Sequence, residues 1–309
     1  MISVIIPLYN KEKYILKALH SVLEQSFQDF EVVVIDDGSK DNGPEAVRSI
    51  TDRRFRLISQ ANAGVSAARN RGISDSKFDL IAFLDADDVW ESNHLETILR
   101  LKENFPHAGA YATAYKLVFP NGKTRNIVCH GVPKLNWEGI LPNYFKSATY
   151  GLPPMHTSAT CVRKQVFEKL GTFADGECLG EDLDMWARVA MHYPVAYSSL
   201  PSSNYNWDAE NSLIINKTWE KEWVFARNIR YYECKTDCNS FVYEYIYKIN
   251  IDTAIQSIRA GNYELARRLI KDNKTTVARK KLALLKLALH MPKWIIQGII
   301  MTKRFIKTI

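Results

Sequence analysis

Two groups of aspartates follow short apolar runs in the first third of the sequence. They are Asp36 and Asp37, after residues 31–35, and Asp85, Asp87 and Asp88, after residues 80–84. Carboxylates that lie close together raise one another's pKa values unless a cation or hydrogen-bond donors compensate them. Hard oxygen ligands at this density favour Mg²⁺ or Mn²⁺, which would in turn hold a diphosphate. The alternative is that strand-end aspartates cap the turns and helices that follow them.

The elements that would position these aspartates follow from the spacing of apolar residues. Continuous apolar runs predict strands, and helical periodicity predicts helices between them. The predicted strands cover residues 2–7, 31–35, 55–59 and 80–84, and the predicted helices cover 14–23, a segment from Pro44, 63–74 and 93–105. Such alternation is typical of a parallel sheet with helices on both faces, whose ligands bind at the carboxyl ends of the strands. We therefore expect an α/β fold with both aspartate groups at one edge of the sheet.

The pattern changes from about residue 109. The predicted elements are a hairpin at 111–119 with a turn at 120–123, a short strand followed by a helix at 158–171, and a helix at 181–192. Beyond Trp219 the spacing is helical, and Gly261-Asn262 separates the two stretches of a helical hairpin. The sequence therefore predicts one domain over residues 1–215 and a C-terminal helical region over residues 216–309.

The composition fits a folded chain rather than a disordered or fibrous one. The 309 residues are 46% hydrophobic and 24% charged, with a net charge of +7. Residues 267–309 alone carry twelve Lys and Arg against one Asp, so the preceding residues are net acidic. A nucleic-acid-binding protein would need its basic face on the folded core, so this distribution excludes nucleic acid as a partner. Five scattered cysteines predict neither a disulfide framework nor a zinc site.

The basic tail has the pattern of an amphipathic helix. Arg279, Lys286 and Lys293 recur every seven residues with leucines on the other side, and Trp294 begins a second apolar segment. This arrangement favours attachment to an anionic membrane, and the alternative is a helix that packs on the body of the protein with a solvated basic face. Neither a signal peptide nor a membrane span is predicted. We therefore expect a cytoplasmic protein, peripheral on the inner face of the cell membrane.

Four motifs resemble the successive signatures of family-two glycosyltransferases. They are Ser3-Val4-Ile5-Ile6-Pro7-Leu8-Tyr9-Asn10, Val34-Ile35-Asp36-Asp37-Gly38-Ser39, Asn62-Ala63-Gly64-Val65-Ser66-Ala67-Ala68-Arg69-Asn70 and Leu84-Asp85-Ala86-Asp87-Asp88. The members of this family are inverting enzymes of the GT-A fold that use nucleotide-diphosphate sugars. The resemblance covers about residues 1–210. It implies a GT-A type nucleotide-binding sandwich with a mainly parallel central sheet, divided into a nucleotide-binding half at 1–105 and an acceptor half at 106–215.

The resemblance also implies which residues bind the donor. Pro7 and Tyr9 would line the nucleobase pocket, with the ring of Tyr9 offered to the base. Asp37 would accept a hydrogen bond from the base, which is commonly uracil in this family. Arg69 would reach the nucleotide or the carboxylates, and the alternative for Arg69 is a salt bridge that locks the aspartates in place.

A divalent cation, Mn²⁺ or Mg²⁺, is implied by the last motif. Asp87 would ligate the ion that bridges the two phosphates of the donor. Asp85 would hold the ribose or a water bound to the metal. Asp85 and Asp88 are further candidate ligands of the ion itself.

The segment Gly180-Glu181-Asp182 supplies a base, because an acceptor hydroxyl must lose its proton as it attacks the sugar. It resembles the family's Glu-Asp signature, which implies that Asp182 is the base and leaves Glu181 as the alternative. The non-catalytic interpretation is an acidic first turn of a helix. His156 and Trp186 are candidate contacts for the acceptor or the sugar, and packing is the alternative for both.

These inferences predict a metal-dependent inverting glycosyltransferase. It would move a single sugar from a nucleotide-diphosphate sugar, most simply a UDP-sugar, to a hydroxyl of a cell-surface glycan or a lipid-linked intermediate. One alternative is a sugar-nucleotidyltransferase, although the glycine-rich phosphate loop of such enzymes is missing after the first strand. The other is a catalytically silent, membrane-associated adaptor of the same fold.

Overall fold

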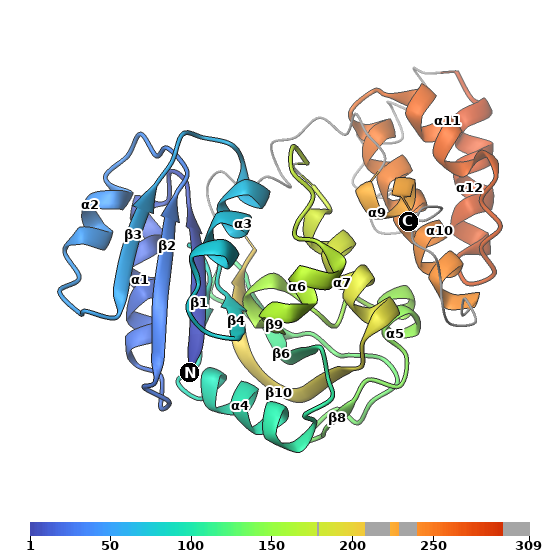
Figure 1. The fold of residues 1–309 in the computed structure, drawn as a ribbon. Coiled ribbons are helices and arrows are strands. Elements are labelled where there is room, and N and C mark those ends of the chain that lie inside the picture. The colour runs from blue at the N-terminus through green and yellow to red at the C-terminus, as the bar shows by residue number, and fades with distance from the viewer. Residues whose placement is uncertain (178, 208–222, 229–239, 293–309) are drawn as a thin grey trace. The chain divides into compact units, whose positions relative to one another are not determined.

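The computed structural model describes residues 1–177, 179–207, 223–228 and 240–292 (Figure 1). Contacts between Cα atoms divide the chain into two compact units, Met1–Ser212 and Leu213–Ile309. We call the first the sheet unit and the second the helical unit, and we describe each by itself. The domain boundary proposed from the sequence, between residues 215 and 216, lies outside the described residues.

The first half of the sheet unit is a parallel sheet. Its strands are β1 (Ile2–Leu8), β2 (Phe30–Asp36), β3 (Phe55–Ser59) and β4 (Leu80–Phe83), in the order β3-β2-β1-β4. The register pairs Leu8 with Asp36 and Ile5 with Phe83, so these strands end at the same edge. Every residue of β2 is buried, because the sheet is covered on both faces, and this explains the continuous apolar run in its sequence.

The second half of the sheet is mixed. Here β6 (Ala110–Val118) and β10 (Val195–Asn206) pair in parallel, whereas β9 (Thr160–Arg163) lies antiparallel between β4 and β6. Three short strands make the other antiparallel pairs: β5 (Val89–Trp90) and β8 (Glu138–Ile140) with β10, and β7 (Thr124–Asn126) with β6. The ten-stranded sheet is therefore parallel where the first hundred residues predict it and mixed beyond them.

Helices pack on this sheet as the apolar periodicity predicts (Figure 1). In α1 (Glu12–Leu23), Ile15, Leu19 and Val22 are buried at helical spacing. The helix α3 (Val65–Asp75) approaches β1 so closely that a Cβ atom at Gly72 would lie 2.4 Å from Cγ2 of Ile5. The other α-helices described in this unit are α2 (Gly43–Arg48), α4 (His94–Asn104), α5 (Tyr144–Tyr150), α6 (Lys164–Leu170) and α7 (Glu181–His192).

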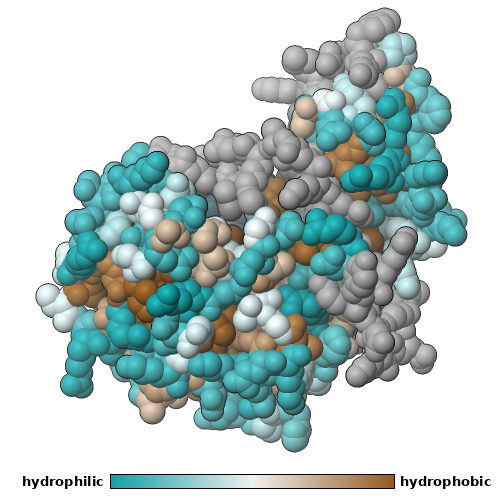
Figure 2. All heavy atoms as spheres, turned by 45° about the horizontal axis from the view of Figure 1, so that its top comes forward, coloured by the Kyte–Doolittle hydropathy of each residue, from teal (hydrophilic) through white to brown (hydrophobic). Residues whose placement is uncertain are grey.

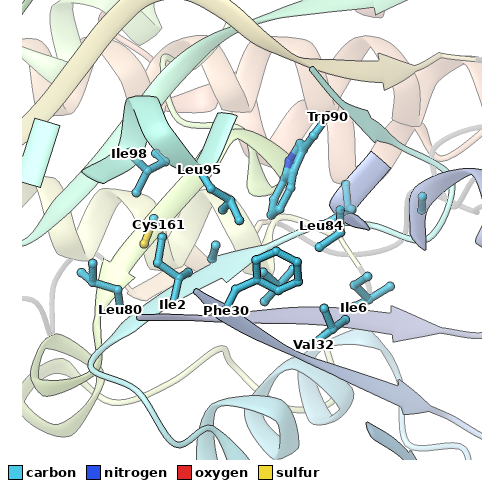
Figure 3. Packing of buried hydrophobic residues seen from close by; sticks show 14 of the residues in the cluster. Ile2, Ile6, Phe30, Val32, Leu80, Leu84, Trp90, Leu95, Ile98 and Cys161 are labelled. Atoms are coloured by element: carbon cyan, nitrogen blue, oxygen red, sulfur yellow. The ribbon is translucent and has the colours of Figure 1, made fainter. Parts of the chain in front are cut away.

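A hydrophobic core forms between one face of the sheet and the helices α1 and α4. Ile2 and Leu80 from the strands meet Leu95 and Ile98 from α4, and Cys161 of β9 lies among them (Figure 3). All these side chains are buried. The core therefore ties β9, which comes late in the sequence, to the elements that precede residue 105.

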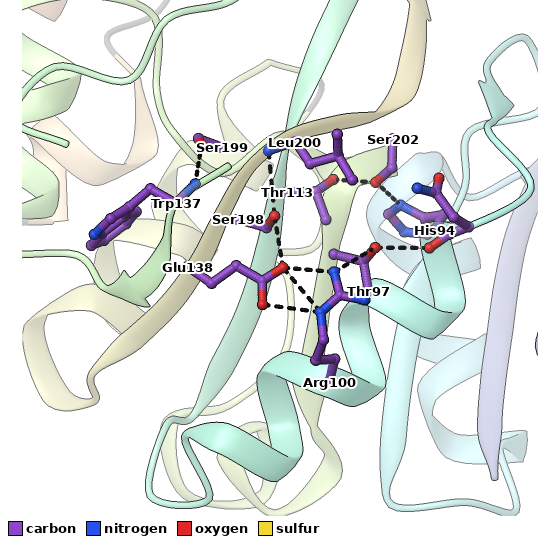
Figure 4. Close-up of polar contacts among 11 residues, drawn as sticks. His94, Thr97, Arg100, Thr113, Trp137, Glu138, Ser198, Ser199, Leu200 and Ser202 are labelled. Carbon is purple, nitrogen blue, oxygen red and sulfur yellow. Dashed lines mark hydrogen bonds and ion pairs between the residues drawn. The ribbon is translucent and has the colours of Figure 1, made fainter. Parts of the chain in front are cut away.

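A polar network links α4 to the second half of the sheet (Figure 4). Arg100 Nη2 donates to Glu138 Oε1 at 2.7 Å, and Ser198 donates to the same oxygen at 3.2 Å. On the same helix, Nδ1 of the buried His94 lies 2.8 Å from Oγ of Ser202. Burial lowers the pKa of His94 to about 3, so its imidazole is neutral. The network therefore fixes the position of β10, whose end contributes to the site described below.

The helical unit contains α9 (Val224–Asn228), α10 (Ser240–Arg259), α11 (Tyr263–Lys271) and α12 (Arg279–His290). The helical hairpin predicted around Gly261-Asn262 is confirmed: Gly261 has a φ of +81° and Asn262 Oδ1 accepts a hydrogen bond from the Leu265 N–H at 3.1 Å. The positive φ of Gly261 is strained for residues with a side chain. This glycine therefore allows the chain to reverse between α10 and α11.

The apolar side of α12 is buried inside the helical unit. Leu282, Leu285 and Leu289 pack against residues of α10 and α11, so they are not free to enter a membrane. Lys293, Trp294 and the rest of the predicted apolar segment lie outside the described residues. None of the helices in the described part of the chain is long and apolar enough to cross a bilayer.

Candidate functional site

The loop after β1 presents an aromatic ring at the carboxyl edge of the sheet. Asn10 adopts a left-handed conformation with a φ of 51°, and its Oδ1 accepts a hydrogen bond from the Lys40 N–H at 2.8 Å. The Asn10 N–H donates to Ser39 Oγ at 3.2 Å, so the loops after β1 and β2 are joined. This arrangement leaves Tyr9 44% exposed, next to the half-buried Pro7. An exposed ring at this edge can stack on a flat ligand such as a base.

Asp37 lies at the same edge and is held by protein donors. Its Oδ1 accepts hydrogen bonds from Gln60 Nε2 at 2.8 Å and the Ala63 N–H at 2.9 Å, and its Oδ2 accepts from the Gly64 N–H at 2.8 Å. A carboxylate offers about four lone-pair positions, so about one remains for a ligand. Asp37 therefore fixes the start of α3 as well as offering an acceptor.

Arg69 of α3 joins two carboxylates from distant parts of the sequence. Its Nη2 donates to Asp85 Oδ1 at 2.8 Å, and its Nη1 donates to Glu181 Oε1 at 2.9 Å. The guanidinium also lies 5.4 Å from the ring centroid of Phe173. Burial alone would lower the pKa of Arg69, but the two carboxylates raise it above its ordinary value. The salt bridge that the sequence left as the alternative for Arg69 is present, and it brings the start of α7 to the end of β4.

Asp87 forms an ion pair that the sequence analysis did not anticipate. Lys11, in the loop after β1, donates from Nζ to Asp87 Oδ2 at 2.7 Å. Burial raises the pKa of Asp87 above its ordinary value and the neighbouring Asp85 adds to the shift, although Lys11 opposes it. The signal in the sequence was a basic residue directly after Tyr9-Asn10.

Asp88 is a buried link between three segments. Its Oδ2 accepts a hydrogen bond from Ser158 Oγ at 2.6 Å, and its Oδ1 accepts from the Asn206 N–H at 2.9 Å at the end of β10. Burial, reinforced by Asp87 and Asp85, raises the pKa of Asp88 well above its ordinary value. Because Asp88 is 1% exposed and both its oxygens have donors, it positions the β4 loop and is the weakest of the candidate metal ligands.

Asp182 lies in the first turn of α7, beside Glu181. Its Oδ1 accepts a hydrogen bond from the Leu183 N–H at 2.7 Å, and its side chain is half-buried. Burial raises the pKa of Asp182; Arg69 and the Leu183 N–H oppose this shift, whereas Asp85 adds to it. Burial, together with Asp182, also raises the pKa of Glu181, to about 7. Asp182 has no cation bonded to it among the described residues, whereas Glu181 is bonded to Arg69.

His156 lies between two tyrosines beside these carboxylates. Its ring centroid is 4.8 Å from that of Tyr115 and 4.5 Å from that of Tyr205. Burial lowers the pKa of His156 to about 4, so the imidazole is neutral. Its Nδ1 is buried without a hydrogen-bond partner in the described part of the chain. A neutral ring with one unsatisfied nitrogen can still bond a hydroxyl of a ligand.

Trp186 is placed in the core rather than at the surface of the site. It is fully buried, and its ring lies 5.5 Å from that of Phe173 and 5.9 Å from that of Phe83. Its position in the second turn of α7, facing the sheet, gives it this packing role. The sequence could not distinguish a buried aromatic ring from one that faces a sugar.

The structure therefore gathers a set of acidic groups that we call the carboxylate cluster. Its members are Asp85, Asp87, Asp88, Glu181 and Asp182, and the described cations bonded to them are Arg69 and Lys11. Burial raises the pKa of Tyr205, and the aspartates Asp88, Asp85, Asp87 and Asp182 add to this shift. Because carboxylates outnumber these cations, the cluster has negative charge left to compensate.

The cluster has the donor set for a cation that is shared with a ligand. Within the described residues, no group of three or more His, Cys, Asp or Glu side chains is arranged to hold a metal ion by itself. Mg²⁺, however, is commonly bound through one or two carboxylates, with water and substrate phosphates as its other ligands. Asp87 and Asp85 are half-buried carboxylates, so they fit this kind of shared metal site.

An α/β sheet with acidic loops at the carboxyl ends of its strands is typical of enzymes that bind a nucleotide at that edge. Comparison with known proteins identifies the particular family: the sequence model described as "Glycosyl transferase family 2" matches residues 3–171, and the chain belongs to this family. Similar curated proteins include the uncharacterized glycosyltransferase alr2836 of Nostoc sp., which is 33% identical over 172 residues, or 55% of this chain and 52% of that protein. The chain is also 40% identical over 101 residues to the glycosyltransferase GlyA of Streptococcus pneumoniae, covering 32% of this chain and 14% of GlyA. The matches span about half or less of these relatives.

The fold is also similar to solved structures. TarS residues 1–349 of S. aureus, crystallised in complex with UDP-GlcNAc, match with a TM-score of 0.68 and 19% identity, over 93% of this chain and 90% of that one. This likeness confirms the predicted GT-A fold. The chain therefore has the GT-A fold and belongs to the glycosyl transferase family 2, which disfavours a sugar-nucleotidyltransferase.

Proposed function

We propose that the protein transfers a single sugar, with inversion, from a nucleotide-diphosphate sugar to a hydroxyl of a cell-surface glycan or a lipid-linked intermediate. The observation that carries this proposal is the carboxylate cluster, in which Asp182 of α7 is brought to the aspartates after β4 through the Arg69 ion pairs. A base and a diphosphate-binding group are needed in one place for such a transfer. A UDP-sugar is the simplest donor, and the complex of the TarS neighbour with UDP-GlcNAc supports it.

The donor would lie along the carboxyl edge of the sheet. The exposed ring of Tyr9, with Pro7 beside it, would stack on the base. The remaining lone pair of Asp37 would accept a hydrogen bond from the edge of the base. Asp87, with Asp85, would hold Mn²⁺ or Mg²⁺, and this ion would neutralise charge on the departing diphosphate. Lys11 is bonded to Asp87 and is positioned to exchange that carboxylate for a phosphate oxygen.

Asp182 would act as the base. As the acceptor oxygen bonds to the anomeric carbon, the bond from that carbon to the diphosphate oxygen breaks on the opposite face, and the hydroxyl proton moves to Asp182. The Leu183 N–H occupies Oδ1, so Oδ2 is the oxygen available to the proton. A raised pKa makes the carboxylate a better base than an exposed aspartate. Glu181 remains the alternative base, but its bond to Arg69 favours a positioning role.

We also propose attachment to an anionic membrane through the basic C-terminal region. The excess of cations in residues 267–309 supports this attachment. It would bring the enzyme to acceptors that reside at membranes.

The proposal for Asp182 is tested by steady-state kinetics with radiolabelled UDP-sugars and a lipid-extract acceptor. Loss of a general base costs about 10²–10⁴-fold in rate, so Asp182→Asn should lower kcat by that factor and leave the KM for the donor unchanged. The matched control is Glu168→Gln, which removes an exposed carboxylate from α6. Wild-type turnover in Asp182→Asn, or an equal loss in Glu168→Gln, would remove Asp182 from the role of base.

A further inference from the structure

A basic groove lies between α11 and α12 of the helical unit. It has a volume of about 720 Å³, and its charged lining residues are Glu264, Arg267, Arg268, Lys271, Lys286 and His290. Four of these side chains carry a permanent positive charge, against the single carboxylate of Glu264. A groove with this balance is suited to an anion rather than to a neutral or cationic ligand.

The helical repeat explains why the cations gather. In α11, Arg267, Arg268 and Lys271 stand three, four and seven residues after Glu264, so they share one face. The opposite face of α11 is buried. In α12, Lys286 and His290 are four residues apart and flank the buried Leu289. The unburied faces of α11 and α12, which carry these charged residues, therefore line the groove together.

The cations in the groove are largely free of protein partners. Arg267 Nη2 donates to the Leu289 carbonyl at 3.1 Å, which fixes its guanidinium across the two helices. His290 Nδ1 bonds to the carbonyl of Lys286 at 2.7 Å. The side chains of Arg268, Lys271 and Lys286 have neither a hydrogen bond nor an ion pair with any residue that the structure describes. Like charges so placed repel one another, and an anion in the groove would relieve that repulsion.

An exposed apolar strip runs along the face of α12 beside the groove. Leu284 is 43% exposed and Leu287 is 59% exposed. Residues three apart on a helix differ by about 60° around its axis, so Leu287 adjoins His290 and Leu284 adjoins Leu287. Figure 2 shows hydrophilic and hydrophobic surface side by side on the helical unit. A free phosphate would use the cations alone, whereas a membrane offers phosphates and an apolar layer together.

We propose that the groove between α11 and α12 binds the phosphate headgroups of anionic phospholipids, while Leu284 and Leu287 enter the acyl boundary. The inference rests on the proposed membrane attachment, but it assigns that attachment to described residues before position 293. It also uses different leucines from the buried set on the other side of α12. The arrangement is typical of interfacial binding, in which cations meet phosphates and adjacent apolar side chains are buried.

Sedimentation of the full chain with vesicles tests this proposal. Each cation near an anionic surface contributes about 5-fold in partition, so R268Q/K271Q/K286Q should lower partition to phosphatidylglycerol-containing vesicles on the order of 100-fold. The charge-matched control, K17Q/R53Q/K123Q, changes exposed residues of the sheet unit and should sediment like the wild type. L284S/L287S should also weaken sedimentation, and vesicles of phosphatidylcholine alone should bind none of these proteins strongly. Circular dichroism checks that each variant is folded.

Two results would overturn the proposal. The first is wild-type sedimentation of R268Q/K271Q/K286Q. The second is wild-type sedimentation of L284S/L287S together with equal competition by free glycerol phosphate, which would indicate a soluble phosphate ligand. UDP binding, measured on the same samples by calorimetry, separates this test from the proposed transferase function. If the groove variants lose vesicle binding but keep UDP binding, the result supports the groove proposal and leaves the transferase proposal untouched. If the wild type does not bind UDP, the result contradicts the transferase proposal and leaves the groove proposal untouched.

Discussion

Replacing Arg69 with glutamine should destabilise the sheet unit strongly. Arg69 is 4% exposed and bonded to two carboxylates, so Arg69→Gln leaves negative charges without their cation. Breaking a buried ion pair by removing one partner costs about 3–5 kcal/mol. Glu181 accounts for more of this cost than Asp85, because its side chain is 9% exposed and that of Asp85 is 27% exposed. We expect a loss of about 3–4 kcal/mol in the free energy of unfolding at pH 8.

Two features distinguish this explanation from a simple loss of packing. In Arg69→Gln with Glu181→Gln, the more buried charge is gone, so about half of the lost stability should return. Without Arg69, the folded-state pKa of Glu181 should rise from its present value of about 7, far above the value in the unfolded chain. The charged form of Glu181 then opposes folding. The loss of unfolding free energy caused by Arg69→Gln should therefore shrink as the pH falls from 8 to 6, because the Glu181 carboxyl takes up a proton.

The assay is hydrogen exchange measured by mass spectrometry on peptides from β1 and β4. The slowest amides of these strands report the unfolding of the sheet unit, independently of the helical unit. A value for Arg69→Gln within about 1 kcal/mol of the wild type would refute the reasoning, since that is the range of an exposed ion pair. So would a double variant that is less stable than the single one at pH 8.

Three further predictions concern other parts of the sheet unit. Glu31 is buried and accepts hydrogen bonds from the Ser3 hydroxyl, the Lys77 N–H and the Arg56 guanidinium. Burial raises the pKa of Glu31, but these three donors together lower it below its ordinary value of 4.5. Glu31→Gln should therefore cost about 1–3 kcal/mol in the free energy of unfolding at pH 7. This cost should narrow as the pH falls through the lowered folded-state pKa, and a series of urea unfolding curves from pH 7 downward past the unfolded-state pKa would reveal it. Gly72→Ala should cost about 1–3 kcal/mol by overpacking against Ile5, whereas Ser74→Ala, at an exposed position of the same helix, should leave the unfolding midpoint nearly unchanged. Tyr9→Ala should weaken UDP binding by about 1–3 kcal/mol in calorimetry, the value of one stacked base, and unaltered binding would exclude the stacking role.

The first half of the fold was predictable because local patterns decide it. The strands β1 to β4 and the helices between them follow from apolar periodicity, and the parallel sheet fixes which loops meet. The sequence alone therefore assigns the two aspartate groups to one edge. The order of the second half could not be predicted, because β9 inserts between β4 and β6 through pairs that lie about 80 residues apart in the sequence for β4 and about 50 for β6.

The site was predicted in its residue types and less well in its contacts. The motifs located Asp85, Asp87 and Asp182, but no local pattern showed that Lys11 would bond to Asp87 or that Asp88 would be buried against Ser158. These contacts depend on which side chains the fold brings together across long separations. Trp186 illustrates the same limit, because helical spacing gives a face but not what covers it.

The basic tail shows how one amphipathic pattern fits two surfaces. The leucines of α12 that periodicity singled out are buried against α10 and α11. The leucines of α12 that remain exposed, Leu284 and Leu287, lie on a different face. The sequence could not show whether a membrane or the protein covers the buried leucines, because an apolar face predicts burial without specifying its partner.

Titration calorimetry of UDP in the presence of Mn²⁺ and in the presence of EDTA examines whether the carboxylate cluster holds a divalent ion with the donor. We expect binding that depends on Mn²⁺ in the wild type and in Glu168→Gln, and that is lost when Asp87→Asn removes the carboxylate now bonded to Lys11. Equal UDP binding with Mn²⁺ and with EDTA, or undiminished Mn²⁺-dependent binding in Asp87→Asn, would contradict the assignment of this cluster as the metal and diphosphate site.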